Sequence, residues 1–215
     1  MTTHYIHRGL AKKNFKENTL SAFKYSFKKK YGIETDLQVT KDNQLICFHD
    51  FNLRRKFNLN KNVEDINYYS LKKISKKRKA TVPLLKDLLK IAKNKYPLLL
   101  EIKPLLSKIS LLNLIKLVKK TKKYGIISFK EKNLINLYKI NKKLPLGLLF
   151  LSTSSFTNIK MKSKKKHVNF LVLEKKFLSN KNLHLIKKKI YYYTIKKKNI
   201  FKKFKKTKNL IFENL

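Results

Sequence analysis

The chain has 215 residues, 42% of them hydrophobic, and a formal net charge of +42. That length allows one well-buried domain and is short for two. The single cysteine, Cys47, excludes an intrachain disulfide and is expected to be a small buried side chain. The N-terminus lacks the features of a signal peptide, and no apolar run approaches the roughly 18 residues of a membrane span. We expect one cytoplasmic domain over residues 1–215, and the sequence leaves its oligomeric state open.

The positive charge by default suggests a nucleic acid or an anionic membrane surface as partner. Nearly all of it comes from Lys residues spread along the whole chain, whereas a dedicated phosphate-reading surface would favour the forked guanidinium group of Arg. Abundant Lys, Asn and Ile beside four Gly and four Pro is typical of codon bias in an AT-rich genome. We therefore expect no dedicated nucleic-acid partner. A basic domain that binds an anionic surface stays open as an alternative.

The first fifty residues alternate between short β-rich runs and a segment of helical period. Residues 4–7 form a candidate strand, and residues 17–32 carry apolar side chains three and four apart, which predicts a helix. Residues 32–40 then predict a strand, and a second apolar run follows closely at residues 44–50. Parallel strands need a crossover of about a dozen residues or more, so this second run is expected to fold back antiparallel.

Residues 51–80 contain no clean strand and one short amphipathic piece, so we interpret them as an insertion. Regular alternation resumes afterwards. The expected helices are 83–96, 110–125, 131–143, 181–189 and 199–208, and the expected strands are 97–103, 126–129, 144–151, 168–174, 190–195 and 209–212. With the hairpin counted once there are eight strand positions, which predicts a (β/α)₈ TIM barrel with a short insertion after the hairpin. An open doubly wound sheet is the alternative architecture.

Carboxylates are scarce, and three of them lie on predicted strands. Glu34 and Asp36 are two apart, so both side chains leave the same face of their strand, and Glu101 ends the apolar run that precedes it. Carboxylates inside a barrel would be costly unless a cation neutralised them. Three oxygen ligands suit one divalent metal, Mg²⁺ or Ca²⁺, better than Zn²⁺. The competing interpretation is that each is a surface carboxylate paired with one of the many Lys residues.

Two histidines also end predicted strands. His7 ends the first strand and His49 the strand that returns from the hairpin, and active sites gather at the carboxyl ends of barrel strands. Their imidazoles could act as general acid and general base. Arg8 offers a guanidinium fork to a phosphoryl group, and Lys103 offers a point charge. A metal, two His and two cations at one barrel mouth predict phosphodiester cleavage.

Several motifs in this order and spacing resemble the glycerophosphodiester phosphodiesterase family: "HRG", "ENTLSAF", "ETDLQVTKDNQLICFHD", "VPLLKDLL" and "LEIK". The resemblance continues through "GIISF", "LPLGLLF", "YYYTI" and "NLIFENL", so it covers essentially the whole chain. It implies a TIM barrel whose small insertion follows the "HD" motif, here residues 51–80. It also implies hydrolysis of glycerophosphodiesters, the deacylated phospholipids, to sn-glycerol 3-phosphate and an alcohol.

The resemblance further implies a role for each site residue. Its acid/base pair would be His7 and His49, its metal ligands Glu34, Asp36 and Glu101, and its substrate and phosphate ligands Arg8, Lys103, Ser128 and Tyr193. Several positions depart from the family pattern: Lys16 stands where the family has Pro, Tyr193 and Lys196 where it has Trp and Asn, and Phe212 and Glu213 where it has Thr and Asp. A related enzyme acting on another phosphodiester or on a lysophospholipid stays open, although a lysophospholipase would need an apolar groove or a membrane anchor.

Overall fold

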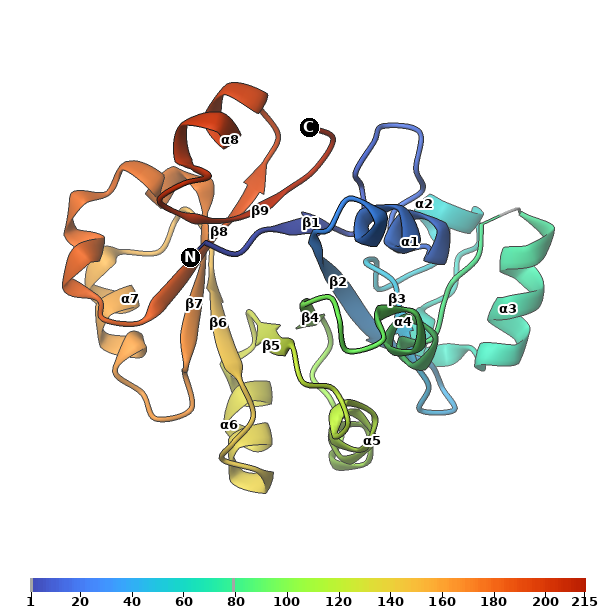
Figure 1. Ribbon diagram of the computed structural model, residues 1–215. Helices are drawn as coiled ribbons and strands as arrows, with labels where there is room; N and C mark the ends of the chain where they lie inside the picture. The colour runs from blue at the N-terminus through green and yellow to red at the C-terminus, as the bar shows by residue number, and fades with distance from the viewer. Residues whose placement is uncertain (1, 79) are drawn as a thin grey trace.

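The computed structural model describes residues 2–78 and 80–215, and its centre is a closed barrel (Figure 1). Each strand of the barrel is parallel to its neighbours, and β1 pairs with both β2 and β9, which closes the sheet. This closure confirms the TIM barrel and excludes the open sheet. The barrel strands are β1 (Tyr5–His7), β2 (Gly32–Val39), β4 (Leu98–Ile102), β5 (Tyr124–Ser128), β6 (Leu146–Phe150), β7 (Phe170–Glu174), β8 (Lys189–Ile195) and β9 (Asn209–Phe212).

The second strand of the predicted hairpin lies outside the barrel. Strand β3 (Leu45–Cys47) runs antiparallel to β2, with Leu37 opposite Cys47. The antiparallel prediction is therefore confirmed, and Cys47 is buried as expected. Because β3 runs back along the end of β2, the loop that follows it returns to the barrel mouth, where His49 lines a pocket.

Helices surround the barrel and pack on its outer face (Figure 1). Polar side chains begin some of them: the Thr19 hydroxyl accepts a hydrogen bond from the Ala22 amide, and Ser107 does the same for Ser110. The helices are α1 (Leu20–Lys28), α4 (Leu85–Ala92), α5 (Lys108–Val118), α6 (Glu131–Ile140), α7 (Phe156–Ser163) and α8 (Lys198–Phe204). Helix α7 is capped by Ser155 and was not among the predicted elements.

The helix predicted over residues 181–189 is wrong. The connection from β7 to β8 instead consists of two 3₁₀ helices, η2 (Lys175–Ser179) and η3 (Lys181–Leu185). Within residues 181–189 the buried side chains are Leu183 and Ile186, and their spacing of three matches the 3₁₀ repeat. One short apolar edge does not offer the wider stripe that an α-helix needs to pack on the barrel.

Two hydrophobic layers hold the barrel together. A large cluster lies between strands and helices, and a smaller one fills the interior, where it includes Tyr5, Leu99, Phe170 and Ile211. Gly147 makes room for the Phe170 ring, since a Cβ on Gly147 would lie 2.2 Å from a ring carbon. The lower interior is thus filled with apolar atoms, which leaves the polar side chains to the carboxyl ends of the strands.

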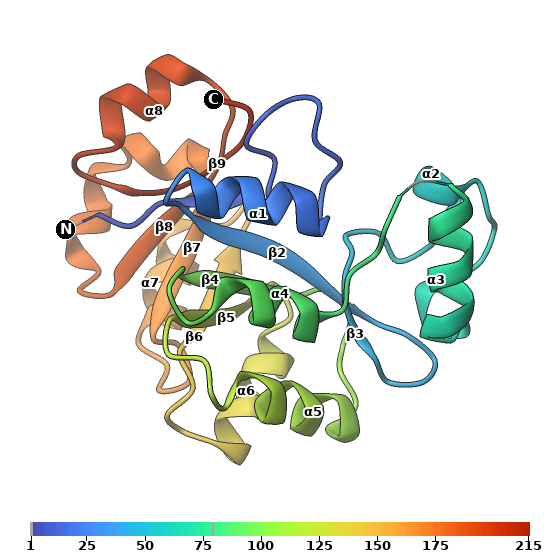
Figure 2. The same cartoon turned by 45° about the vertical axis from the view of Figure 1, so that its right-hand side comes forward.

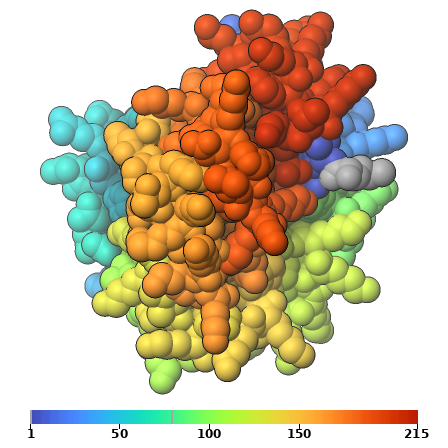
Figure 3. All heavy atoms as spheres, turned by 90° about the vertical axis from the view of Figure 1, so that its left-hand side faces the viewer, coloured from blue at the N-terminus to red at the C-terminus, as the bar shows by residue number. Residues whose placement is uncertain are grey.

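The segment after β3 forms a separate lobe beside the barrel (Figure 2). It comprises α2 (Arg54–Phe57), η1 (Val63–Asp65) and α3 (Tyr68–Lys77). Its own small hydrophobic cluster includes buried Phe57 and Leu71. In the space-filling view of Figure 3 the second half of the chain, in yellow to red, covers most of the visible face, and the lobe appears in cyan at one edge. Within the described residues, no helix is both long and apolar enough to cross a membrane.

Candidate active site

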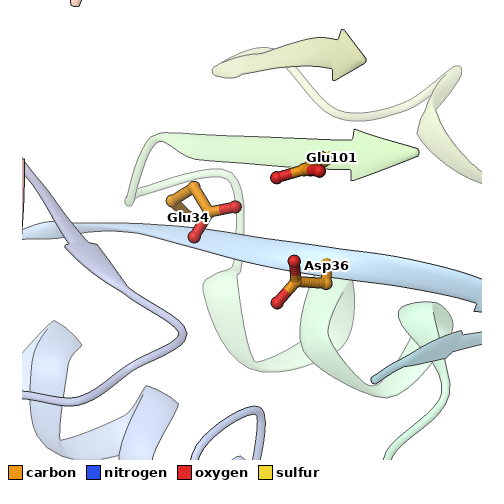
Figure 4. A group of neighbouring side chains, drawn as sticks. All are labelled: Glu34, Asp36 and Glu101. Atoms are coloured by element: carbon orange, nitrogen blue, oxygen red, sulfur yellow. The ribbon is translucent and has the colours of Figure 1, made fainter. Parts of the chain in front are cut away.

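The parallel register places the polar side chains of three neighbouring strands next to each other. His7 of β1 is aligned with Glu34 of β2, and Asp36 of β2 is aligned with Glu101 of β4. Residues aligned in neighbouring strands project to the same face of a sheet, here the barrel interior. Glu34, Asp36 and Glu101 point toward one another in Figure 4.

The three carboxylates form a compact, buried group. One oxygen from each of Glu34, Asp36 and Glu101 lies within 4.8 Å of the others, and all three side chains are buried. The Glu34 Oε2 atom is buried without a hydrogen-bond partner among the described residues. An orphaned carboxylate oxygen beside two further oxygen donors fits a hard divalent cation such as Mg²⁺ or Ca²⁺.

The pKa values of these three carboxyl groups indicate an excess of negative charge in the cluster. Burial, followed by repulsion from Asp36 and Glu101, raises the pKa of Glu34 well above its usual value. Burial and repulsion from Asp36 likewise raise the pKa of Glu101 to about 7. Burial would also raise the pKa of Asp36, but positive neighbours, Arg8 foremost, lower it. The cluster therefore holds more carboxylate than its protein cations neutralise, which favours binding of a dication.

Arg8 and Lys103 are the cations that contact this cluster. The Arg8 Nε atom lies 3.1 Å from Asp36 Oδ2, and the Lys103 Nζ atom lies 3.0 Å from Glu101 Oε1 and 3.7 Å from Asp36 Oδ1. Both residues also line the pocket above the carboxylates. Two positive groups at the edge of a carboxylate cluster can bind a phosphate group.

The backbone at Arg8 adopts an unusual conformation that places its side chain beside the carboxylates. Arg8 has a φ of 51°, in the left-handed region that is unfavourable for a side chain with a Cβ. Hydrogen bonds of 2.8 Å fix it on both sides, from its amide to the Glu34 carbonyl and from the Asn18 amide to its carbonyl. Buried Asn18 also donates to Asp36 Oδ2 at 3.0 Å and accepts from Thr35 Oγ1 at 2.8 Å. Thr19 caps α1, so the Asn18 side chain is free to orient Asp36.

His7 is held from the last strand of the barrel. Its Nδ1 atom lies 2.5 Å from Glu213 Oε2, and its Nε2 atom lies 3.8 Å from Glu34 Oε2. The other oxygen of Glu213 lies 2.9 Å from Lys196 Nζ. Burial opposes ionisation of Glu213, but the hydrogen bonds from His7 and Lys196 outweigh it and lower its pKa to about 2. An ionised Glu213 places the His7 proton on Nδ1 and leaves Nε2 for proton exchange.

His49 has a similar partner within its own loop. Its Nδ1 atom lies 2.7 Å from Asp50 Oδ1. Burial would raise the pKa of Asp50, but hydrogen bonds from Arg55 and His49 lower it, so this carboxylate is also ionised near neutral pH. Each predicted acid/base histidine thus has a carboxylate on Nδ1, and both line the same pocket.

The pocket has a volume of about 290 Å³ and lies over the carboxylate cluster. Its wall is partly aromatic, since Phe129 and Tyr193 pack edge to face with ring centroids 6.2 Å apart. The Tyr193 hydroxyl donates to the Phe150 carbonyl at 3.1 Å, which fixes the ring. The pocket is lined by His7, Arg8, Glu34, His49, Glu101, Lys103, Ile127, Phe129, Leu149, Leu151, Tyr193, Thr194, Lys196 and Ile211.

Ser128 does not belong to this lining and needs a correction. Its side chain is fully buried, and its hydroxyl donates to the Ile102 carbonyl at 2.9 Å. The Lys130 amide and the Asn133 side chain donate to the same hydroxyl. These contacts join the ends of β4 and β5 to α6, so Ser128 supports the frame and we do not retain it as a substrate ligand.

Several residues that support the site were not predicted from the sequence. Asp50 directly follows His49, and this adjacency could have indicated its role. Glu213 was noted only as a departure from the family pattern, and Glu17 and Arg55 gave no local signal, because each reaches the site from a loop or helix whose position depends on the fold. The other predicted site residues lie together around one pocket: His7, Arg8, Glu34, Asp36, His49, Glu101, Lys103 and Tyr193.

Residues 7–208 match the model of the glycerophosphoryl diester phosphodiesterase family. The chain belongs to this family. The match begins at His7 and includes the three carboxylates and both histidines, so the family resemblance seen in the sequence is confirmed.

Curated relatives match over shorter stretches. A glycerophosphodiester phosphodiesterase of Bacillus altitudinis is 36% identical over 99 residues, which are 42% of this chain and 40% of the relative. A human lysophospholipase D is 39% identical over 72 residues, which are 33% of this chain and 23% of that protein. The chain thus spans well under half the length of the curated relatives it matches.

Solved structures match over the full length of the chain and show the same fold. A glycerophosphodiester phosphodiesterase from Thermotoga maritima is 20% identical with a TM-score of 0.84, and covers 100% of this chain and 95% of its own. A phosphodiesterase from Oleispira antarctica, solved with its product sn-glycerol 3-phosphate, is 18% identical with a TM-score of 0.82, and covers 100% and 93%. These likenesses agree with the barrel described above.

Proposed function

We propose that this protein hydrolyses glycerophosphodiesters to sn-glycerol 3-phosphate and an alcohol, with a divalent metal and a pair of acid/base histidines. The observation that carries the proposal is the buried group Glu34, Asp36 and Glu101 beneath a pocket that two histidines and two cations also line. Family membership over residues 7–208 supports the same substrate class. The predicted cytoplasmic location belongs to this proposal as well.

The carboxylates would hold the metal. Glu34 and Asp36 supply oxygens from β2 and Glu101 from β4, and the orphaned Glu34 Oε2 gains a partner on binding. Such a cation supplies Lewis-acid stabilisation of the negative charge on the phosphoryl oxygens. We propose Mg²⁺ or Ca²⁺ because all the donors are hard oxygens.

The cations would bind the phosphate. Arg8 and Lys103 line the pocket beside the carboxylates, and both are buried enough for their charge to act strongly. Burial opposes the charged form of Lys103, but the carboxylates Glu101 and Asp36 raise its pKa, so it stays protonated as it faces the phosphate. The charge that develops in the transition state is thereby stabilised by groups already in place.

His7 and His49 would move the protons. In the first step one imidazole removes the proton from the attacking glycerol hydroxyl group, and the other protonates the departing alcohol oxygen as its bond to phosphorus breaks, which leaves a cyclic phosphate. In the second step the two imidazoles exchange roles, and water opens the cyclic phosphate to sn-glycerol 3-phosphate. Glu213 and Asp50 hold the two rings through Nδ1, which directs proton exchange to Nε2. Tyr193 and Phe129 form the apolar side of the pocket, against which the carbon skeleton of a glycerol group can pack.

Lysophospholipids are a second candidate substrate class because the pocket mouth carries exposed apolar side chains. Phe129 is 38% exposed and Leu151 is 51% exposed, and both line the pocket. These two residues offer the apolar surface that the sequence alone did not reveal, and a single acyl chain could pack against them. Comparing glycerophosphocholine with lysophosphatidylcholine in one assay distinguishes the two substrate classes.

The test is release of sn-glycerol 3-phosphate from glycerophosphoethanolamine by the purified protein, with Mg²⁺ or Ca²⁺ and then with a chelator. We expect activity that the chelator abolishes and that Glu34→Ala also abolishes. Glu64→Ala is the matched control, since Glu64 is exposed on the lobe and outside the pocket. Calorimetric titration of each variant with Mg²⁺ measures the site independently of turnover. Absence of product from a folded protein with several head groups and both metals would reject the proposal.

A further inference from the structure

One side chain of the lobe reaches the supports of two site residues. Arg55 lies on α2, and its guanidinium Nε is 2.6 Å from Asp50 Oδ2 while its Nη2 is 3.1 Å from Asp50 Oδ1. The same Nη2 also pairs with Glu17 Oε1. Arg55 therefore joins the loop after β3 to the loop after β1.

Each of these two carboxylates uses its contacts to hold a residue of the pocket. Asp50 Oδ1 binds His49 Nδ1 at 2.7 Å, and Glu17 Oε2 binds Arg8 Nη1 at 2.9 Å. The result is a continuous chain of alternating charges in which Arg55 is the central member. It ends at the predicted acid/base histidine on one side and at the phosphate-binding arginine on the other.

We propose that Arg55 is a positioning residue that sets His49 and Arg8 relative to each other, an inference that rests on the proposed function. The lobe then serves the reaction by fixing the distance between the proton-transfer group and the phosphate ligand. A planar guanidinium suits this task because one fork binds Asp50 through two nitrogens and still reaches Glu17. A lysine would offer a single point of contact in the same place.

The carboxylates in this chain remain charged. Burial would raise the pKa of Glu17, but hydrogen bonds from Arg55 and Arg8 lower it. Burial acts in the same direction on Asp50, and hydrogen bonds from Arg55 and His49 again lower its pKa. Both ion pairs are therefore present around neutral pH. A second contact reinforces the junction, since Lys56 Nζ donates to the Glu17 carbonyl at 3.1 Å.

An ordinary surface ion pair would behave differently from a positioning residue. The Arg55 side chain is 57% exposed, and exposed pairs contribute little to folding stability. A positioning role instead predicts a large effect on turnover with a small effect on folding, because small displacements of reacting groups cost much catalysis. The neighbouring Arg54 is the matched control: it lies on the same short helix and is exposed, and its guanidinium contacts neither Glu17 nor Asp50.

The experiment compares Arg55→Ala, Arg55→Lys and Arg54→Ala with the unmodified chain, using glycerophosphoethanolamine and Mg²⁺. We expect Arg55→Ala to lower kcat/KM about 10- to 100-fold, with kcat affected as well as KM. The kcat/KM of Arg55→Lys should lie between the values of Arg55→Ala and the unmodified chain. Guanidinium ion below denaturing concentration should restore part of the activity that Arg55→Ala loses. Arg54→Ala should match the unmodified chain, and all variants should melt at similar temperatures.

A second measurement does not depend on turnover. The side-chain ¹⁵N resonances of His49, assigned by their absence in His49→Gln, report its hydrogen bond to Asp50. We expect Arg55→Ala to shift or broaden them and Arg54→Ala to leave them unchanged. Should Arg55→Ala fail to fold, Arg55→Gln keeps most of the stem and serves in its place.

The outcomes separate the inference from the proposed function. If the unmodified chain is active and Arg55→Ala equals Arg54→Ala in both kinetics and resonances, the positioning role is wrong while the proposed function stands. If the unmodified chain releases no product, the proposed function fails. In that case the His49 resonances still decide whether Arg55 positions this ring.

Discussion

The strands β1, β2 and β4 and the strands β5 to β9 build one barrel but contribute to it very differently. Nine of the twelve carboxylates lie within the first 101 residues, and the first three barrel strands carry the whole acidic cluster. The later strands present mostly apolar interior side chains such as Leu149, Val172 and Ile211. The proposed catalytic and metal-binding groups are thus concentrated on one arc of the barrel, and the remaining strands supply the pocket wall.

Glu213 is the exception that makes the comparison informative. It lies after β9 at the far end of the sequence, and yet it contacts His7 because barrel closure places β9 beside β1. Lys196, after β8, binds the other oxygen of Glu213. Two of the departures from the family pattern, Lys196 and Glu213, are therefore in contact with each other, and the longer glutamate still reaches His7.

The largest effect is expected within the acidic arc, from His49→Gln. Loss of this proposed acid/base group should lower kcat about 10²- to 10⁴-fold, since proton transfer contributes that much to catalysis. His184→Gln is the matched control, because His184 is exposed on η3, is bonded to the Lys181 carbonyl and is not among the residues that line the pocket. Steady-state kinetics with glycerophosphoethanolamine measures both. Equal activity of the two variants would remove His49 from the mechanism.

A smaller effect is expected from the second half, through Glu213→Gln. The amide still fits the space but no longer carries the charge that orients His7, so kcat/KM should fall about 10- to 100-fold. Glu131→Gln offers a close control, because Glu131 also pairs with a histidine and a lysine, His167 and Lys162, but outside the pocket.

If Glu213→Gln proves as active as Glu131→Gln, the later strands are only a wall. Every residue that assists proton transfer would then belong to the first half of the chain. An intermediate loss in Glu213→Gln alone sharpens the comparison instead, since it assigns one positioning residue to the second half.

The smallest effect concerns stability in acid. The pKa of Glu213 is lowered from an ordinary 4.5 to about 2, so its ion pairs stabilise the fold fully above the unfolded pKa and are lost as the pH falls toward 2. The free energy of unfolding of the unmodified chain should decline more between pH 5 and pH 2 than that of Glu213→Gln, by about 1 kcal/mol or a little more. Urea titrations at several pH values measure the difference, and parallel curves would contradict it.

Much of the fold could be predicted because local patterns carried it. Apolar runs alternating with helical segments indicated eight strands, and the short link after residue 40 indicated the antiparallel β3. The connection before β8 was misjudged, because Leu183 and Ile186 suit a 3₁₀ turn as well as an α-helix and the difference depends on what the barrel surface accepts. Helix α7 was missed for a similar reason, since its flanking Ser and Lys residues weaken the apolar period.

The sequence by itself determined which groups can carry chemistry. A spacing of two on a strand puts Glu34 and Asp36 on one face whatever the fold around them, and strand ends place His7 and Lys103 at one edge of the sheet. Tertiary structure alone decided the partners of these groups. Glu213 reaches His7, and Arg55 reaches Asp50 and Glu17, only because ring closure and lobe packing bring together segments far apart in the chain. Buried Ser128 shows the same limit from the other side, since a motif can name a residue but cannot say toward which side of the barrel wall its hydroxyl turns.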